Sequence, residues 1–256
     1  MSVSSLDIFH ALVAVHIATG ATGLVTFWVP VLAGKGNERH KYWGRIFTAM
    51  MVVTGTVAVG MATMTLLYPM ETHPHLTDHE VFSDPENVRV VFGWMMLYLA
   101  ILTVNLAWYG WMCVTNKRMH HQLNKGRINL FLQILLAMAA ANCIWQGVKL
   151  DQPLVMGMSL VGFATVATNL WFIFHPRPGP VYWLKEHIKA HVGAGISVYT
   201  AFFAFGAVRL MPELALTPVL WAIPLVTGIS LILYHQRSVS RKMPPRARSG
   251  TRVAAE

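Results

Sequence analysis

The chain has 256 residues, of which 55% are hydrophobic and only 12% are charged. A soluble domain typically carries about twice that charged fraction, so the composition excludes an ordinary soluble protein and indicates a membrane protein. The net charge of +9 collects in short polar links and a basic tail, where it can meet anionic lipid headgroups. It therefore gives no reason to expect nucleic acid as a partner; the expected partner is the lipid bilayer.

Seven apolar stretches follow one another, and each approaches the ~20 residues that a helix needs to cross hydrocarbon. In chain order they are Ile8–Leu32, Trp43–Leu67, Val90–Cys113, Ile128–Val148, Leu154–Phe174, Leu184–Val208 and Val219–Tyr234. We predict an all-α polytopic membrane protein, built as a bundle of seven transmembrane helices. Residues 1–237 should form this single domain, and residues 238–256 a basic, disordered cytoplasmic tail.

The polar links alternate in charge along the chain. Basic residues follow the first, third, fifth and seventh stretches: Lys35, Arg39, Lys41 and Arg45; Lys117, Arg118, Lys125 and Arg127; Arg177 and Lys185; Arg237, Arg241, Lys242, Arg246 and Arg248. The other polar segments carry mainly acidic residues. Because basic links stay on the cytoplasmic side, the N-terminus is expected outside and the C-terminus in the cytoplasm.

Histidine is the main reactive side chain within these spans. No Asp, Glu, Lys or Arg falls deep in a predicted span, which argues against a carrier coupled to protons or cations. His16 lies about nine residues below the outer end of its helix, or ~14 Å by helical rise. An imidazole at that depth needs either a hydrogen-bond partner or a ligand to bind, and the sequence leaves both open.

A second group of histidines gathers at the cytoplasmic ends of the predicted helices. Its members are His40, His120, His121, His175, His187 and His191. Residues four apart share one helical face, so His187 and His191 can present two imidazoles to one metal ion, with His40 as a further ligand. The alternative is an interfacial pair in contact with water and headgroups.

Three histidines are each followed by a glycine four positions later: His16 by Gly20, His40 by Gly44, and His191 by Gly195. On a helix this leaves a gap one turn from an imidazole, where a flat macrocycle or a neighbouring helix can lie. We therefore predict a site for haem b or a divalent metal, with Arg45 available for an anionic cofactor edge.

The longest outer link, Pro69–Arg89, holds a mixture of possible metal ligands. These are His73, His75 and His79 with Glu71, Asp78 and Glu80. Such a set can take up a borderline divalent metal. A solvated loop without a ligand is the alternative.

Two segments, VHIATG at residues 15–20 and HKYWGR at residues 40–45, resemble an uncharacterised bacterial family of predicted polytopic membrane proteins. The segments EHIKAH at 186–191 and TAFF at 200–203 are similar to a later part of that family. Lys41 stands where the family usually has arginine, and His191 where it often has methionine. The resemblance implies a multi-pass protein of the bacterial inner membrane, and the family carries no assigned activity.

The leading hypothesis is that histidines of several helices hold a haem or a metal ion, for electron transfer with quinone or another membrane redox protein. A second is a zinc-dependent membrane hydrolase that uses the H-x-x-x-H pair and a third histidine, with Glu186 close in sequence. A third is a small-molecule carrier or binding protein with a pocket of aromatic and amide groups: Trp94, Asn105, Gln133 and Asn142. No catalytic residue can be assigned.

Overall fold

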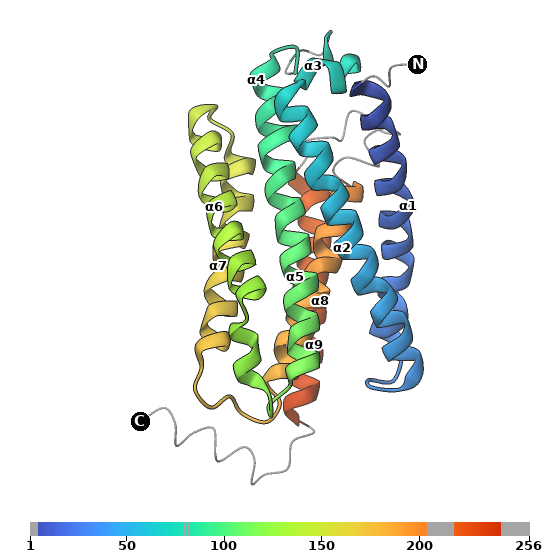
Figure 1. Ribbon diagram of the computed structural model, residues 1–256, viewed down its shortest axis with the longest axis vertical. Helices are drawn as coiled ribbons and strands as arrows, with labels where there is room; N and C mark the ends of the chain where they lie inside the picture. Colours follow the sequence, from blue (N-terminus) through green and yellow to red (C-terminus); the bar gives the residue numbers. More distant parts are fainter. Residues whose placement is uncertain (1–4, 79, 81, 204–217, 242–256) are drawn as a thin grey trace. The chain divides into compact units, whose positions relative to one another are not determined.

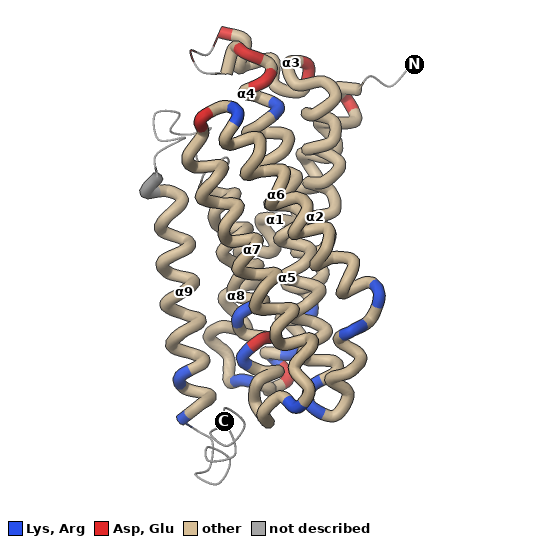
Figure 2. The backbone as a smooth tube through the Cα atoms, turned by 90° about the vertical axis from the view of Figure 1, so that its left-hand side faces the viewer, with Lys and Arg blue, Asp and Glu red and all other residues tan. Residues whose placement is uncertain are grey.

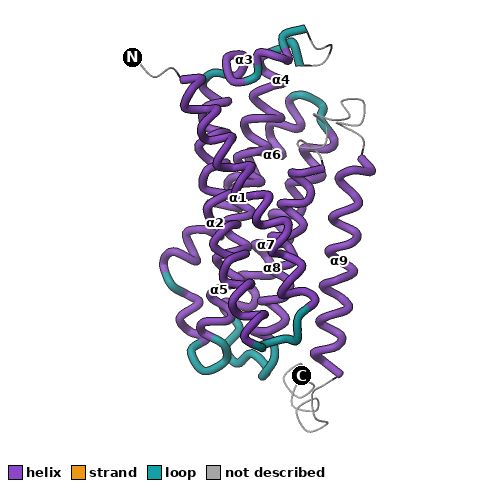
Figure 3. The backbone as a smooth tube through the Cα atoms, turned by 90° about the vertical axis from the view of Figure 1, so that its right-hand side faces the viewer, coloured by secondary structure: helices purple, strands orange, loops and turns teal. Residues whose placement is uncertain are grey.

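The computed structural model describes residues 5–78, 80, 82–203 and 218–241 (Figure 1). This part of the chain is α-helical and contains no strand (Figure 3). Within it, five helical stretches are long and apolar enough to cross a membrane: Ser5–Leu32, Glu38–Leu67, Pro85–Asn116, Arg127–Lys149 and Pro153–Phe174. The prediction of an all-α chain with membrane-spanning character is confirmed.

The helices follow the predicted apolar stretches closely. They are α1 (Ser5–Leu32), α2 (Glu38–Leu67), α3 (Pro69–Thr72), η1 (Pro74–Leu76), α4 (Pro85–Val88), η2 (Arg89–Met95), α5 (Met96–Asn116), η3 (His121–Lys125), α6 (Arg127–Lys149), α7 (Pro153–Phe174), α8 (Tyr182–Ala201) and α9 (Pro218–Arg241). The sixth predicted stretch corresponds to α8, and its last residues, 204–208, lie outside the described residues. The seventh corresponds to α9.

Helix α9 continues to Arg241, four residues into the segment predicted to be a disordered tail. Its last turns stay helical because backbone hydrogen bonding continues, and the Ser240 hydroxyl donates back to Gln236 O at 2.9 Å. The remainder of the predicted tail, residues 242–256, lies outside the described residues.

The chain divides into two compact units. The first comprises Met1–Asn105 and Leu132–Val166, and the second Leu106–Phe131 and Ala167–Glu256. Each unit is described on its own below.

In the first unit, α1 and α2 form a closely packed antiparallel pair (Figure 1). The turn between them needs glycine, since Gly36 has φ +81°. Asn37 then caps α2 by accepting a 2.7 Å hydrogen bond from His40 N. Small residues allow the backbones to approach: Gly20 packs on Thr54 Cγ2, and the Thr54 hydroxyl donates to Thr19 Oγ1 at 2.8 Å.

The same unit packs α5 against α2 and α7 through glycine and tyrosine. A Cβ at Gly55 would lie 3.1 Å from Ala100 O, so only glycine allows this approach of α2 to α5. Tyr98 is fully buried, and its hydroxyl donates to Met158 O on α7 at 2.8 Å. A polar hydroxyl buried in this way needs such a partner.

Charges separate along the α1–α2 pair of the first unit. Acidic residues lie along the α3–α4 segment, whereas basic residues lie in the link between α1 and α2 and in the first turns of α2 (Figure 2). The two groups are at opposite ends of α2, which is 30 residues long and therefore spans about 45 Å.

The second unit contains the end of α5, the start of α6, the end of α7, and α8 with α9. Its helices also meet at glycines, because a Cβ at Gly193 of α8 would lie 3.2 Å from the Leu106 side chain of α5. A Cβ at Gly228 of α9 would overlap with Ile196 of α8. The histidine pair of α8 lies in this unit.

Candidate functional site

Several polar and titratable side chains gather where α8 packs on α5 in the second unit. The His187 ring donates from Nδ1 to the backbone carbonyl of Gly110 at 3.2 Å. The His191 ring lies directly against the same glycine, and a Cβ there would overlap with it. The two imidazole centroids are 4.4 Å apart. The structure thus brings His187 and His191 together on one face of α8, with Gly110 opposite both.

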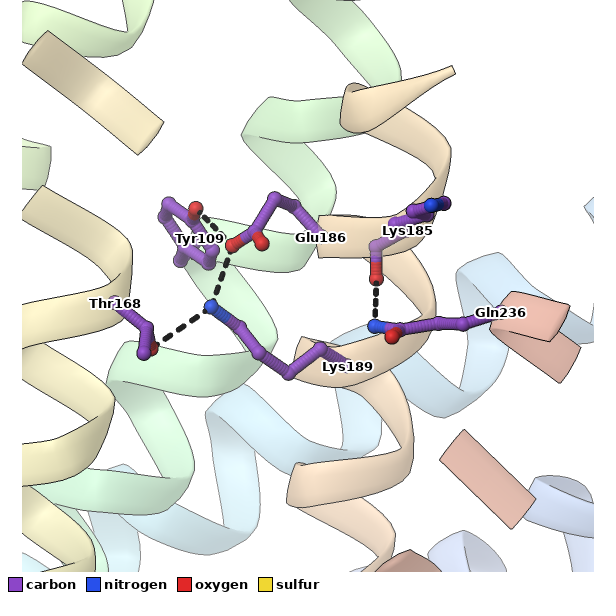
Figure 4. A network of polar contacts seen from close by, with 6 residues as sticks. All are labelled: Tyr109, Thr168, Lys185, Glu186, Lys189 and Gln236. Atoms are coloured by element: carbon purple, nitrogen blue, oxygen red, sulfur yellow. Dashed lines mark hydrogen bonds and ion pairs between the residues drawn. The ribbon is translucent and has the colours of Figure 1, made fainter. Parts of the chain in front are cut away.

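A network of polar side chains continues from this pair on the adjoining face of α8 (Figure 4). Tyr109, next to Gly110 in the chain, donates its hydroxyl proton to Glu186 Oε2 at 2.6 Å. Lys189 donates to the same carboxylate oxygen and, at 3.0 Å, to Thr168 Oγ1 of α7. Glu186 is only 8% exposed. A buried carboxylate is tolerable here because it accepts from a phenol and a cation.

Glu186 and His187 therefore face different partners although they are neighbours in sequence. The carboxylate points toward Tyr109 and Lys189 (Figure 4), whereas the imidazole contacts Gly110. A general base that serves a metal held by His187 must lie within hydrogen-bond reach of the metal-bound water. Glu186 is occupied by other donors and is not oriented for that task.

Two further predicted ligands, His16 and His40, lie on the α1–α2 pair of the first unit. His16 donates from Nδ1 to Thr54 O at 3.2 Å, and His40 donates from Nδ1 to Pro30 O at 3.0 Å. Both residues are half-buried. They are separated by about 14 residues along either helix, or about 21 Å. The structure does not bring these two rings together.

His16, His40 and His187 thus share one arrangement. In each, Nδ1 donates to a backbone carbonyl of the adjacent helix. A carbonyl can only accept, so Nδ1 carries the proton and Nε2 of the neutral ring carries the lone pair. This tautomer, held by a carbonyl, is the one that commonly presents Nε2 to a metal.

The glycines predicted to leave space beside a histidine have different surroundings in the structure. At Gly44 no atom lies within 4 Å of the position of a Cβ, so the face of α2 one turn beyond His40 is open. At Gly20 the corresponding position is in ordinary contact with Thr54, 3.7 Å away, so this glycine serves the packing of α1 on α2. Gly195 is buried in α8, and Arg45 is exposed on α2.

A separate polar cluster in the second unit organises the turn after α5. His121 donates from Nε2 to His175 O at 3.1 Å and accepts at Nδ1 from Asn124 Nδ2 at 3.2 Å. Burial lowers the pKa of His121. Asn116 donates to Asn124 Oδ1, and Asn129 donates to Asn124 O, both at 2.7 Å. Both ring nitrogens of His121 are engaged, so this histidine stabilises the turn.

The outer link of the first unit holds His73 among aromatic rings. Its ring centroid is 4.8 Å from that of Phe92 and 5.8 Å from that of Phe9. The Thr72 hydroxyl lies 3.0 Å from His73 Nδ1. Burial, followed by the nearby His75, lowers the pKa of His73 to about 4. His79, the third histidine of the predicted outer metal set, lies outside the described residues.

Among the described residues, no group of three or more His, Cys, Asp or Glu side chains is placed to hold a metal ion. The chemistry offered is therefore that of single or paired imidazoles, of which His16, His40 and His187 are anchored on helix carbonyls. Binding to a cofactor that needs one or two protein ligands is compatible with this arrangement.

Reasoning from the sequence alone missed Gly110, Tyr109, Lys189 and Asn124. Gly110 is 77 residues before His187 and sits in an otherwise apolar span. Lys189 and Glu186 were visible as an (i, i+3) pair, which is a signal for a salt bridge on a helix. The partner that buries this pair, Tyr109, could be found only from the packing of α5 on α8.

Comparisons with protein-family models, with curated proteins and with solved structures give no match for this chain.

Proposed function

We propose that the chain is a multi-pass protein of the bacterial inner membrane that binds haem b through helix histidines and takes part in membrane electron transfer. The observation that carries this proposal is the shared state of His16, His40 and His187, whose Nδ1 atoms donate to carbonyls of adjacent helices. Each neutral ring thereby keeps the Nε2 lone pair that iron would use.

Haem is favoured over a protein-bound metal ion by the number of ligands each requires. A catalytic zinc ion takes about three protein ligands, whereas haem iron receives four nitrogens from its porphyrin and needs only one or two residues. The described residues offer histidines singly and in pairs, and no group of three placed to hold a metal ion. When bound, haem would supply a one-electron couple suited to exchange with quinone or another membrane redox protein.

Among the candidates, His40 has the surroundings that best fit a macrocycle. Its ring is anchored on Pro30 O, and the face of α2 one turn further on is open at Gly44. Arg45 is exposed beside this face and could pair with a propionate, which suits a guanidinium. His187 and His191 are the second candidate pair, with Gly110 allowing their rings to lie against α5.

The zinc hydrolase receives less support from the geometry. Its candidate base, Glu186, accepts hydrogen bonds from Tyr109 and Lys189. In the carrier hypothesis the histidines bind no ligand and only connect neighbouring helices. The same hydrogen bonds from Nδ1 are compatible with that role. The effect of histidine substitution on bound cofactor separates the three hypotheses.

We further propose seven spans, with α8 and α9 as the sixth and seventh, an outer N-terminus and a cytoplasmic C-terminus. Support comes from α8 and α9 themselves, which are 20 and 24 residues long, and from the basic α1–α2 link opposite the acidic α3–α4 segment (Figure 2). Basic links remain in the cytoplasm. Reporter fusions at residues 36, 80 and 122 should give cytoplasmic, external and cytoplasmic signals.

The decisive experiment is extraction in mild detergent after expression with haem precursors, followed by an absorbance spectrum and analysis of iron and zinc. We expect the Soret and α bands of b-type haem and stoichiometric iron. His40→Ala should remove or strongly reduce these bands, and His187→Ala tests the α8 pair in the same way.

His120→Ala is the matched control, because His120 is exposed in the link after α5 and should leave the spectrum unchanged. If the protein is colourless and binds stoichiometric zinc that is lost in His191→Ala, the haem proposal is wrong and the zinc hydrolase takes its place. If the protein is colourless and metal-free, and folds without His16, His40 and His187, the carrier hypothesis remains.

A further inference from the structure

Partly exposed aromatic side chains gather in the second unit where α7 ends and α8 begins. Trp171 and Phe174, in the last turn of α7, are each 54% exposed. The Trp171 ring lies 5.1 Å from His175 and 5.8 Å from Tyr182, and His175 stacks on Tyr182 at 6.3 Å. Trp183 is fixed beside them by a 3.0 Å hydrogen bond from Nε1 to Pro180 O. Three of these rings, Trp171, His175 and Tyr182, thus contact one another, and Phe174 and Trp183 lie close to them in the chain.

Three lysine side chains lie over this surface, each within cation–π distance of a ring. Lys117 Nζ is 5.7 Å from the centroid of Trp183, Lys125 Nζ is 5.4 Å from Phe174, and Lys185 Nζ is 5.6 Å from Tyr182. Lys117 directly follows α5, Lys125 is the last residue of η3, and Lys185 lies in the first turn of α8. None of the three forms an ion pair with a carboxylate of the described residues. We call these lysines and rings the lysine–aromatic surface.

The charge of the second unit is strongly unbalanced around this surface. Its described residues carry nine basic side chains: Lys117, Arg118, Lys125, Arg127, Arg177, Lys185, Lys189, Arg237 and Arg241. They carry one carboxylate, Glu186, which is buried and paired with Lys189. Lys117, Lys125 and Lys185 therefore have no carboxylate partner among the described residues of this unit, and an anion from outside would be attracted to them.

We propose that the lysine–aromatic surface binds the headgroup of an anionic phospholipid. Tryptophan and tyrosine rings favour the headgroup level of a bilayer. Lysine stems lie along apolar surface there while their ammonium groups reach outward. An ammonium group binds phosphate as a point charge, and each of the three ammonium groups lies over an aromatic ring where α7 ends and α8 begins.

A lipid fits this surface better than a free anion. The exposed rings of Trp171 and Phe174 would contact the glycerol and upper acyl region of a lipid, and a free phosphate has no apolar part to use them. The surface is independent of the proposed haem ligands, since it contains none of His16, His40, His187 and His191.

The test is retention of lipid by the full-length protein purified from nanodiscs of mixed phosphatidylglycerol and phosphatidylcholine, measured by native mass spectrometry. We expect the protein to retain phosphatidylglycerol selectively. The triple variant Lys117→Gln, Lys125→Gln, Lys185→Gln should lose at least about tenfold in apparent affinity, because it removes all three ammonium groups that attract the anionic headgroup.

The matched control removes three positive charges elsewhere, through Lys35→Gln in the link between α1 and α2 and Arg39→Gln and Lys41→Gln in the first turn of α2. It should retain lipid as the parent protein does. Equal loss in both variants, or no loss in either, would overturn the proposal. Displacement of the lipid by inorganic phosphate at similar concentration would also overturn it, in favour of a free anion. If the triple variant fails to fold, Lys185→Gln alone should show a smaller selective loss, and an unchanged affinity there would count against the proposal.

Discussion

Tyr109 and Glu186 form a 2.6 Å hydrogen bond between α5 and α8, and Lys189 donates to the same carboxylate oxygen (Figure 4). The bond also sets the register of the two helices. Gly110 follows Tyr109 in the chain and His187 follows Glu186, and the second pair is joined by its own 3.2 Å hydrogen bond. The charged network and the histidine pair are therefore two adjoining contacts of one helix interface.

Replacing Glu186 by alanine should destabilise the protein strongly. The change leaves the partly buried Lys189 ammonium without its carboxylate, and breaking a buried pair in this way costs about 3–5 kcal/mol. Tyr109→Phe should cost only about 1–2 kcal/mol, because Lys189 still neutralises the carboxylate. Thermal unfolding in detergent measures both. The double variant Glu186→Leu, Lys189→Met should recover much of the loss, and a Tyr109→Phe cost equal to that of Glu186→Ala would contradict this account.

Gly110→Ala should destabilise the contact between α5 and α8. A Cβ at this position overlaps with the His191 ring and comes within 3.0 Å of the Ala190 Cβ, and overpacking of a tight contact costs about 1–3 kcal/mol. Gly157→Ala is the matched control, because nothing lies within 4 Å of its Cβ position. In a helix that substitution should be neutral or stabilise by up to about 1 kcal/mol. Gly110→Ala should therefore have a lower melting temperature than Gly157→Ala, and the reverse order would contradict the tight packing at Gly110.

The helical spans could be predicted because hydropathy and length are local properties. Ile8–Leu32 and Leu154–Phe174 end at the same residues as α1 and α7. The common face of His187 and His191 could also be predicted, since it follows from the helical repeat. The acidic and basic links also lie at opposite ends of α2, as the charge pattern indicated (Figure 2).

What each side chain meets could not be predicted, because it depends on which helices are neighbours. The sequence offered Gly195 as the gap beside His191, whereas the ring lies against Gly110 on another helix. The sequence left open whether His16 binds a ligand or forms a hydrogen bond. In the structure its ring forms a hydrogen bond with a backbone carbonyl, Thr54 O. Backbone acceptors carry no signature in the amino-acid sequence, so these bonds appear only in the fold.

Asn124→Ala should unfold the turn after α5 before the helices themselves. Asn124 is fully buried, accepts from Asn116 and donates to His121. Its loss leaves the Asn116 amide buried without that acceptor, at a cost of about 1–3 kcal/mol. Hydrogen exchange at residues 117–126 should increase, with little change in α1 and α2. Gln122→Ala is the control, because Gln122 is exposed in the same turn. An unchanged exchange pattern in Asn124→Ala would show that the buried network contributes nothing.

His73 should make the stability of the first unit depend on pH. Its folded pKa of about 4 lies below the ordinary value of 6.5, so between these values the unfolded chain binds a proton that the folded chain does not. Stability from this group is therefore full above about pH 6.5 and falls as the pH drops toward 4, by about 1.4 kcal/mol per pH unit at most and about 3 kcal/mol in total. His73→Phe keeps a ring beside Phe9 and Phe92 and cannot titrate, so its melting temperature should fall less between pH 7 and pH 4.5. His10→Phe, at an exposed histidine, should keep the parent's dependence. Parallel curves for His73→Phe and the parent protein would assign the acid sensitivity to other groups.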